Sequence, residues 1–237
     1  MMAAKGRLFL IPNVISEATE DVVIPIGVKT VLKDLSYFLA EDIRTARRYL
    51  SSLKIYPAIE ALQFEVLNKD TSLQDLSQLM QPIMEGHDIG VLSESGCPGI
   101  ADPGALAIEY AHQQNIRVVP LVGPSSILLA LIASGLNGQQ FAFHGYLPID
   151  AKEAQQKIRE LERESKAKNQ TQIFIETPYR NNSVFDHFLK SLHTDTRLTI
   201  ALDLTGKNEV VQTRSINQWK KIKFNWAKSP AVFLFLA

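Results

Sequence analysis

The sequence predicts an α/β protein of two domains, residues 1–121 and 122–237, with a mostly parallel sheet in the first and a mixed sheet in the second. In the first half, short apolar runs alternate with stretches of helical spacing, which is typical of a parallel sheet. The tripeptide Val122-Gly-Pro124 interrupts this alternation and marks the expected boundary. In the second half, two strand-like runs flank a turn at Gly206-Lys207, which indicates paired strands within a mixed sheet.

The first half contains four apolar runs of strand length. They occupy residues 8–11, 38–40, 89–92 and 116–121. Apolar residues recur at helical spacing from Val28 to Phe38, and further helices are expected over residues 43–53, 72–86 and 105–114.

The second half begins with a helix over residues 125–134, because Pro124 suits a helix start and Gly135 suits its end. Further helices are expected over residues 151–168 and 182–192, and strands over residues 141–146, 172–176, 197–204, 209–214 and 231–236.

The composition excludes several classes of protein. Apolar residues make up 46% of the 237 residues and charged residues 21%, which is typical of a soluble globular chain. No apolar run approaches the ~18–20 residues that span a bilayer, and the first residues lack a signal-peptide core, so we expect a cytoplasmic protein without a membrane anchor. The single cysteine excludes an internal disulfide. Twenty-five basic and 25 acidic residues balance, which disfavours electrostatically driven nucleic-acid binding except through a local patch.

One loop has the features of a ligand-binding site. The apolar run ending at Leu92 passes into a segment with three glycines and two prolines, Gly96 to Gly104, and a helix follows. A glycine-rich turn between a strand and a helix is where open α/β sheets bind ligands. An ordinary tight turn is the alternative. A nucleotide-binding oxidoreductase is disfavoured, because no GxGxxG turn is present.

Five segments resemble the motifs of one enzyme family in the same order. They are FLAEDIRTARRYL (38–50), SESGCPGIADPG (93–104), VVPLVGPSSILLALIASGL (118–136), FAFHGYLP (141–148) and FIETPYR (174–180). The family is that of the RsmI-type ribosomal RNA small-subunit 2′-O-ribose methyltransferases, within the tetrapyrrole methylase superfamily. The resemblance implies the two-domain tetrapyrrole-methylase fold, S-adenosylmethionine (SAM) as methyl donor in a cleft between the domains, ribosomal RNA or the small subunit as partner, and a homodimer.

The resemblance also implies a set of cofactor-binding residues. They are Ser95, Gly96, Cys97, Pro98, Ile100, Ala101, Ser125, Ser126, Glu176 and Tyr179. Three of these positions allow a second interpretation. Cys97 either fills a turn as a small residue or acts as a nucleophile, and the first is favoured because no electropositive setting is evident. The serines at 125 and 126 either cap the following helix or bind SAM.

Methyl transfer requires donor and acceptor to be held in line, and a hydroxyl acceptor also requires a base. By resemblance Glu94 is the best candidate for an acceptor-side carboxylate. Asp102 is a second candidate, or else only the N-cap of the helix that follows. Glu41 and Arg44, in the Glu41-Asp42-Ile-Arg44 segment, either orient the substrate or form a structural ion pair. His144 is interpreted as a packing residue, and no spacing of ligands predicts a metal.

Three segments depart from the family pattern. PNVIS (12–16) lacks the glycine of the corresponding cofactor loop, IDAKEAQQK (149–157) carries less positive charge, and LDLTGK (202–207) keeps the acid Asp203 but lacks the arginine. Fewer basic residues weaken contacts to RNA phosphates. Two alternatives to RNA methylation therefore stay open. One is a methyltransferase acting on a small molecule or a protein, and the other is a non-catalytic SAM-binding module.

Overall fold

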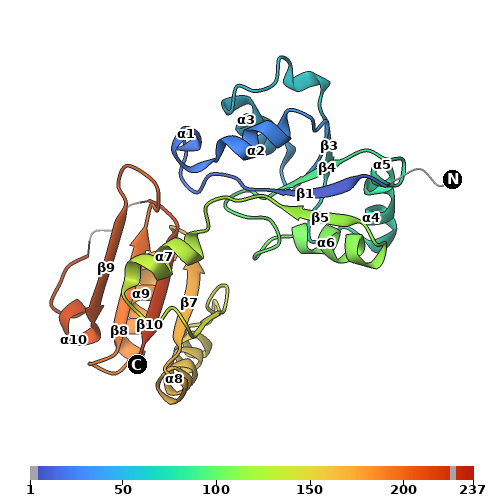
Figure 1. Ribbon diagram of the computed structural model, residues 1–237. Coiled ribbons are helices and arrows are strands. Elements are labelled where there is room, and N and C mark those ends of the chain that lie inside the picture. The colour runs from blue at the N-terminus through green and yellow to red at the C-terminus, as the bar shows by residue number, and fades with distance from the viewer. Residues whose placement is uncertain (1–4, 225–227) are drawn as a thin grey trace. The chain divides into compact units, whose positions relative to one another are not determined.

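The computed structural model describes residues 5–224 and 228–237, and the chain divides into two compact units, one ending at Ser125 and the other beginning at Ser126. Figure 1 labels the elements of both. In the described residues no helix combines the length and the apolar character needed to cross a membrane.

The first unit contains a five-stranded sheet in the order β3-β2-β4-β1-β5. Its strands are β1 (Arg7–Ile11), β2 (Tyr37–Ala40), β3 (Gln63–Val66), β4 (Ile89–Leu92) and β5 (Arg117–Pro120). Every neighbouring pair is parallel. The predicted parallel sheet is therefore confirmed.

Helices cover both faces of this sheet, because its strands are apolar on both sides. Phe9 and Phe38 face one layer, formed by α1 (Glu20–Val23), α2 (Ile26–Leu32) and α3 (Ile43–Ser52). Leu8 and Leu39 face the opposite layer, formed by α4 (Leu73–Leu79), α5 (Gln81–Met84) and α6 (Gly104–Gln113). In Figure 1 these helices lie on opposite sides of the strands. The central Gly90 is required by packing, since a Cβ there would lie 2.3 Å from Ile11 Cδ1.

Two local features differ from the sequence expectation. The helix expected over residues 72–86 is divided into α4 and α5 near Met80, because Pro82 lacks the amide that a continuous helix would use. Strand β3 was not predicted. It is an edge strand of only 4 residues, and although Gln63-Phe64-Glu65-Val66 alternates polar and apolar residues, this alternation is at the lower limit of the length that indicates a strand. A short 3-10 turn, η1 (Ile59–Ala61), precedes it.

The strand order creates a switch point between β1 and β4. The chain leaves β1 through α1 and α2 on one face of the sheet and leaves β4 through α6 on the other. Adjacent parallel strands whose following loops diverge in this way leave a crevice at their carboxyl ends, where α/β proteins bind ligands.

The second unit contains a mixed five-stranded sheet in the order β6-β7-β10-β8-β9. Its strands are β6 (Phe141–Phe143), β7 (Thr171–Glu176), β8 (Arg197–Leu202), β9 (Val210–Ser215) and β10 (Ala231–Leu236). The β6–β7 pair is parallel and the other three pairs are antiparallel. The predicted mixed sheet and the pairing across Gly206-Lys207 are both confirmed.

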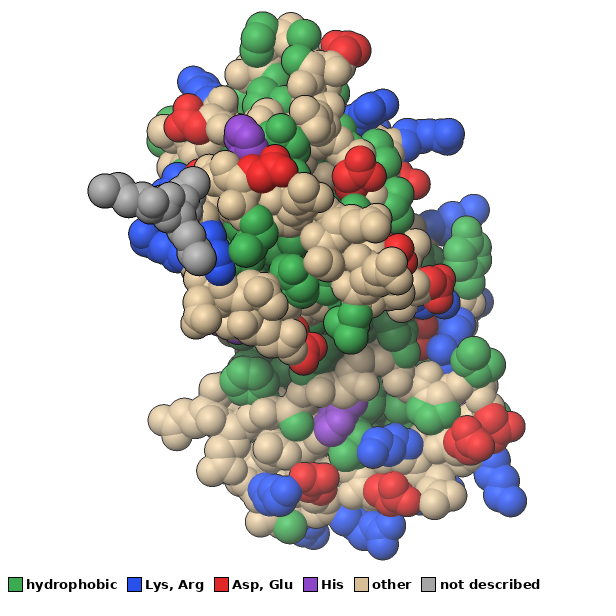
Figure 2. Space-filling model, turned by 90° about the vertical axis from the view of Figure 1, so that its right-hand side faces the viewer, with side chains coloured by type: hydrophobic (Ala, Val, Ile, Leu, Met, Phe, Trp, Pro, Cys, Tyr) green, Lys and Arg blue, Asp and Glu red, His purple; other side chains and the backbone are tan. Residues whose placement is uncertain are grey.

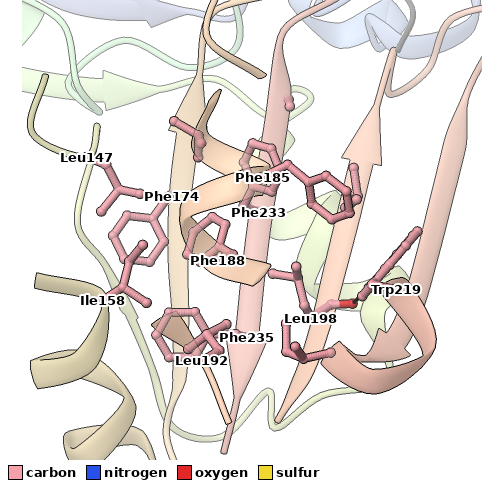
Figure 3. Packing of buried hydrophobic residues seen from close by; sticks show 14 of the residues in the cluster. Leu147, Ile158, Phe174, Phe185, Phe188, Leu192, Leu198, Trp219, Phe233 and Phe235 are labelled. Atoms are coloured by element: carbon pink, nitrogen blue, oxygen red, sulfur yellow. Dashed lines mark hydrogen bonds between the residues drawn. The ribbon is translucent and has the colours of Figure 1, made fainter. Parts of the chain in front are cut away.

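One face of the second sheet packs against α8 (Ala151–Lys168), α9 (Asn181–Ser191) and α10 (Ile216–Trp219), while α7 (Ser126–Ser134) contacts β9 and β10. Figure 3 shows the aromatic core between the sheet and α9. Phe188 lies within 6 Å of the ring centres of Phe174, Phe233 and Phe235. The buried Trp219 donates its indole N–H to the carbonyl of Leu198 at 2.8 Å.

Candidate functional site

Three carboxylates follow neighbouring strands of the first sheet. Glu41 and Asp42 come directly after β2, and Glu94 comes two residues after β4. The parallel register pairs Ala40 with Leu92, so the loops that carry these residues leave the sheet at the same edge. We call Glu41, Asp42 and Glu94 the acidic cluster.

The members of the acidic cluster differ in their electrostatics. Burial raises the pKa of Glu94, and the charges of Glu41 and Asp42 raise it further. The pKa of Asp42 is lowered, chiefly because its carboxylate accepts the backbone N–H of Thr45 at 2.6 Å as the N-cap of α3. Asp42 is thus committed to the helix, whereas Glu94 has the more basic carboxylate.

Arg44 belongs to the exposed side of α3. Its charge contributes to the lowered pKa of Asp42. Among the described residues, no ion pair joins Arg44 to Glu41 or Asp42. The exposed Arg44 side chain is therefore available to a ligand.

Asn13 ties together the two loops that diverge at the switch point. Its Nδ2 donates to the carbonyls of Ser93 at 3.0 Å and Glu94 at 3.1 Å, and its backbone N–H donates to the carbonyl of Gly96 at 2.8 Å. The side chain is only 3% exposed. Sequence reasoning missed this residue, although an asparagine directly after a strand and a proline was a signal for a structured turn.

The segment from Ser93 to Pro103 forms a tightly hydrogen-bonded loop between β4 and α6. Ser93 Oγ donates to the carbonyls of Ser95 at 3.0 Å and Gly96 at 3.2 Å. Gly96 has a φ of +71°, a conformation that favours glycine. Ala101 adopts a similar conformation, with a φ of +58°. Ala101, unlike Gly96, is in a conformation that is unfavourable for a residue with a Cβ, so the backbone of the loop is strained at this position.

Asp102 stabilises this loop from within. Its Oδ1 accepts the backbone N–H groups of Gly99 at 2.7 Å and Gly104 at 2.9 Å. The N-cap of α6 is Pro103, not Asp102 as the sequence suggested. Asp102 nevertheless accepts the first amide of the helix, that of Gly104, from the residue before the N-cap. Its Oδ2 is buried without a hydrogen-bond partner among the described residues, and burial raises its pKa.

Cys97 connects this loop to the one after β5. Its Sγ lies 3.4 Å from the carbonyl of Pro124. Burial raises the pKa of the thiol, and the charge of Asp102 raises it further, so the group is held as a thiol rather than a nucleophilic thiolate. The loops after β1 and β5 also approach closely, since a Cβ on Gly123 would lie 2.0 Å from Pro12 Cβ.

The remaining loop residues named from sequence differ in exposure. Ser95, Ile100 and Ala101 are exposed, with Ile100 at 49%, whereas Gly96 and Pro98 are buried. The exposed side chains surround the strained part of the loop. They are available to a ligand, while the buried ones fix the backbone.

The second unit holds the other candidates. Glu176 ends β7 with its side chain 2% exposed, and its Oε2 lies 3.4 Å from Arg180 Nη1. Arg180 Nη2 in turn donates to the carbonyl of Pro148 at 2.9 Å, which joins the FIETPYR and FAFHGYLP segments. Tyr179 is 97% exposed beside this anchor. The sequence had not assigned this anchoring role to Arg180.

Three further residues have local roles in the second unit. Ser126 is the first residue of α7. His144 stacks on Phe174 at 5.2 Å, and its Nε2 lies 2.6 Å from Gln172 Oε1, which supports its interpretation as a packing residue. Asp203 Oδ2 accepts the backbone N–H of Asn208 at 2.9 Å in the turn before β9. No group of metal-ligating side chains occurs in residues 5–224 and 228–237.

The architecture has counterparts of known structure. Crystal structures of uroporphyrin-III-C-methyltransferase from Thermus thermophilus and of the methyltransferase CobJ each cover 98% of this chain, with TM-scores of 0.54 and 0.61 at 15% identity, over 92% and 94% of their own chains. Diphthine synthase covers 98% with a TM-score of 0.62 at 11% identity, over 90% of its chain. The fold is therefore that of the tetrapyrrole methylases.

Sequence comparison identifies the family of methyltransferases to which the chain is related. Ribosomal RNA small subunit methyltransferase I of Halalkalibacterium halodurans is 32% identical over 86% of this chain and 66% of its own length. The protein of that name from Streptococcus pyogenes serotype M6 is 30% identical over 90% of this chain and 70% of its own. No protein-family model matches the chain. The chain belongs to the ribosomal RNA small subunit methyltransferase I family, and spans about two thirds of the length of these relatives.

Proposed function

We propose that this chain transfers a methyl group from SAM to a ribose 2′-hydroxyl of small-subunit ribosomal RNA. Family membership supports the reaction class. The observation that carries the proposal is the acidic cluster beside the β1–β4 switch point, in which Glu94 has a raised pKa. A hydroxyl acceptor needs such a base.

The loop residues fit SAM. Its sulfonium is a cation, which the charges of the acidic cluster complement. The exposed residues Ser95, Ile100 and Ala101 would hold SAM, and Asp102 Oδ2, which has no hydrogen-bond partner among the described residues, is a buried acceptor in the same loop. When bound, SAM supplies an electrophilic methyl group.

The remaining steps fall to the chain's own groups. The Asn13 hydrogen bonds fix the backbone of Glu94, and the loop after β4 would hold the donor, so that base and donor are both positioned for in-line transfer to the acceptor. The Glu94 carboxylate would take the proton of the acceptor hydroxyl as the methyl group passes from the sulfur of SAM, which leaves as S-adenosylhomocysteine, to the hydroxyl oxygen. Because the Glu94 side chain is exposed, that proton then passes to solvent.

Calorimetric titration with SAM and S-adenosylhomocysteine, followed by labelled methyl transfer to small ribosomal subunits, tests the proposal. We expect saturable binding of both ligands and label in RNA. Glu94→Gln should keep SAM affinity and lower kcat about 10²–10⁴-fold, as expected for loss of a general base. Glu60→Gln, an exposed acid outside the acidic cluster, is the matched control. SAM binding without methyl transfer would instead identify a non-catalytic module.

A small acceptor is the second candidate. Residues 149–157, after the GYLP segment, hold two lysines and two acids and supply no net positive charge there. Label recovered only in the low-mass fraction of a cell extract, with none in RNA, would favour this acceptor.

The family resemblance also supports a homodimer, which we include in the proposal. An apolar face on α7 is consistent with it, since Leu128 is 49% and Ile132 is 78% exposed, one helical turn apart. Light scattering that gives a dimer for the wild type and a monomer for Ile132→Glu would support this assignment, and a monomeric wild type would contradict it.

A further inference from the structure

The zero net charge of the chain conceals two oppositely charged halves. The first unit carries 10 Lys and Arg against 15 Asp and Glu, and the second carries 15 against 10. A polyanion is therefore repelled by the unit with the acidic cluster and attracted by the other. RNA needs its anchoring contacts in the second unit.

The positive charge of the second unit is concentrated at its C-terminal end. Residues 210–237 contain five basic residues, Arg214, Lys220, Lys221, Lys223 and Lys228, and no acidic residue. The lysines at 220, 221 and 223 are exposed and follow α10 directly. In the described part of the chain none of these three forms an ion pair.

Trp219 holds this segment in place. The Arg214 guanidinium lies 5.6 Å from the centre of the Trp219 ring, and the Phe224 ring packs edge-on against the same ring at 5.5 Å. The lysines between Trp219 and Phe224 are thus fixed at both ends. Arg214, Lys220, Lys221 and Lys223 form what we call the basic C-terminal surface, next to the open edge strand β9.

Helix α8 shows a different arrangement. Its lysines and arginines alternate with glutamates, and Lys168 pairs with Glu164 at 2.5 Å. Figure 2 shows the side of the second unit that lies to the right in Figure 1, where basic and acidic side chains are interspersed. Such a surface has little net attraction for phosphate.

We infer that the basic C-terminal surface binds the phosphate backbone of the RNA substrate and anchors it for methylation. The inference rests on the proposed function for the identity of the polyanion. Contacts from lysine and arginine to phosphates release counterions and position RNA without reading its sequence. The basic C-terminal surface supplies the net positive charge that is missing from residues 149–157.

The test compares Lys220→Gln/Lys221→Gln/Lys223→Gln with Lys152→Gln/Lys157→Gln/Lys166→Gln, which removes the same charge from exposed positions of α8. Binding of protein-free small-subunit ribosomal RNA is measured at several salt concentrations without SAM. We expect the first variant to lose about 10-fold or more in affinity, and its log–log salt slope to fall in magnitude by about 2–3, because each phosphate contact contributes about 0.7–0.9. The α8 variant should change affinity by less than about 3-fold.

Equal losses in the two variants, or no loss in either, would overturn the assignment. The proposed function is tested separately, since RNA binding here involves no SAM. Suppose that the wild type transfers no methyl group and that, of the two variants, only the first loses RNA affinity. The assignment of the basic C-terminal surface is then supported, and the proposed methyl transfer is contradicted. If the first variant keeps its RNA affinity while the wild type methylates RNA, only the assignment of the basic C-terminal surface is contradicted.

Discussion

At the scale of single residues, Asn13 is the side chain that secures the switch-point crevice. Asn13→Ala removes two donated hydrogen bonds and leaves the carbonyls of Ser93 and Glu94 without a buried partner. We expect the free energy of unfolding in urea to fall by about 1–3 kcal/mol, and SAM affinity to fall with it. Asn13→Asp keeps the shape but replaces the donor with acceptors, so it should be at least as destabilising. Unchanged unfolding midpoints for both variants would contradict this role.

Glu94 has a predictable effect on stability as pH changes. Its folded-state pKa is raised by burial and by Glu41 and Asp42, so the folded chain holds the proton more tightly than the unfolded chain. Its contribution to stability is therefore lost as pH rises from the unfolded pKa, about 4.3, through the folded pKa. Glu94→Gln should stabilise the chain more at pH 7 than at pH 3.5. Urea titrations at both values measure this, and a pH-independent difference would exclude the mechanism.

At the scale of elements, the loops after β1 and β5 meet too closely for any side chain at Gly123. Gly123→Ala puts a Cβ 2.0 Å from Pro12 Cβ, so one backbone must move. We expect destabilisation of about 1–3 kcal/mol in thermal or urea unfolding, together with weaker SAM binding. Gly138→Ala is the matched control, because nothing lies within 4 Å of its added Cβ. Similar effects of the two substitutions would show that the contact is unimportant.

The elements that the sequence predicted are those whose pattern is strong and local. The buried run of β4, the glycine-rich loop and the charged helix α8 each show their own periodicity or turn chemistry. Strand β3 alternates polar and apolar residues over only 4 positions, Gln63 to Val66, and this short signal is at the lower limit of what indicates a strand. Asn13 and Arg180 act through partners about 80 and 30 residues away in the chain, and such contacts follow from the tertiary fold rather than from local sequence.

At the scale of the whole molecule, each unit has its own core. One unit is built around two clusters on either side of the parallel sheet, and the other around the aromatic cluster of Figure 3. Trp219 is fully buried in the core of the second unit, and the other tryptophan of the sequence also falls within residues 126–237. Tryptophan fluorescence is therefore expected to report on the unfolding of that unit.

Two core truncations use this property to test whether the units unfold separately. Phe188→Ala empties the centre of the aromatic cluster and should cost about 3–5 kcal/mol, while Leu50→Ala, in the first unit, should cost about 2–5 kcal/mol. If each core stabilises its own unit, only Phe188→Ala lowers the urea midpoint detected by fluorescence, whereas circular dichroism detects both losses. Equal fluorescence shifts for the two variants would show instead that the units unfold as one cooperative block, because loss of either core would then reach Trp219.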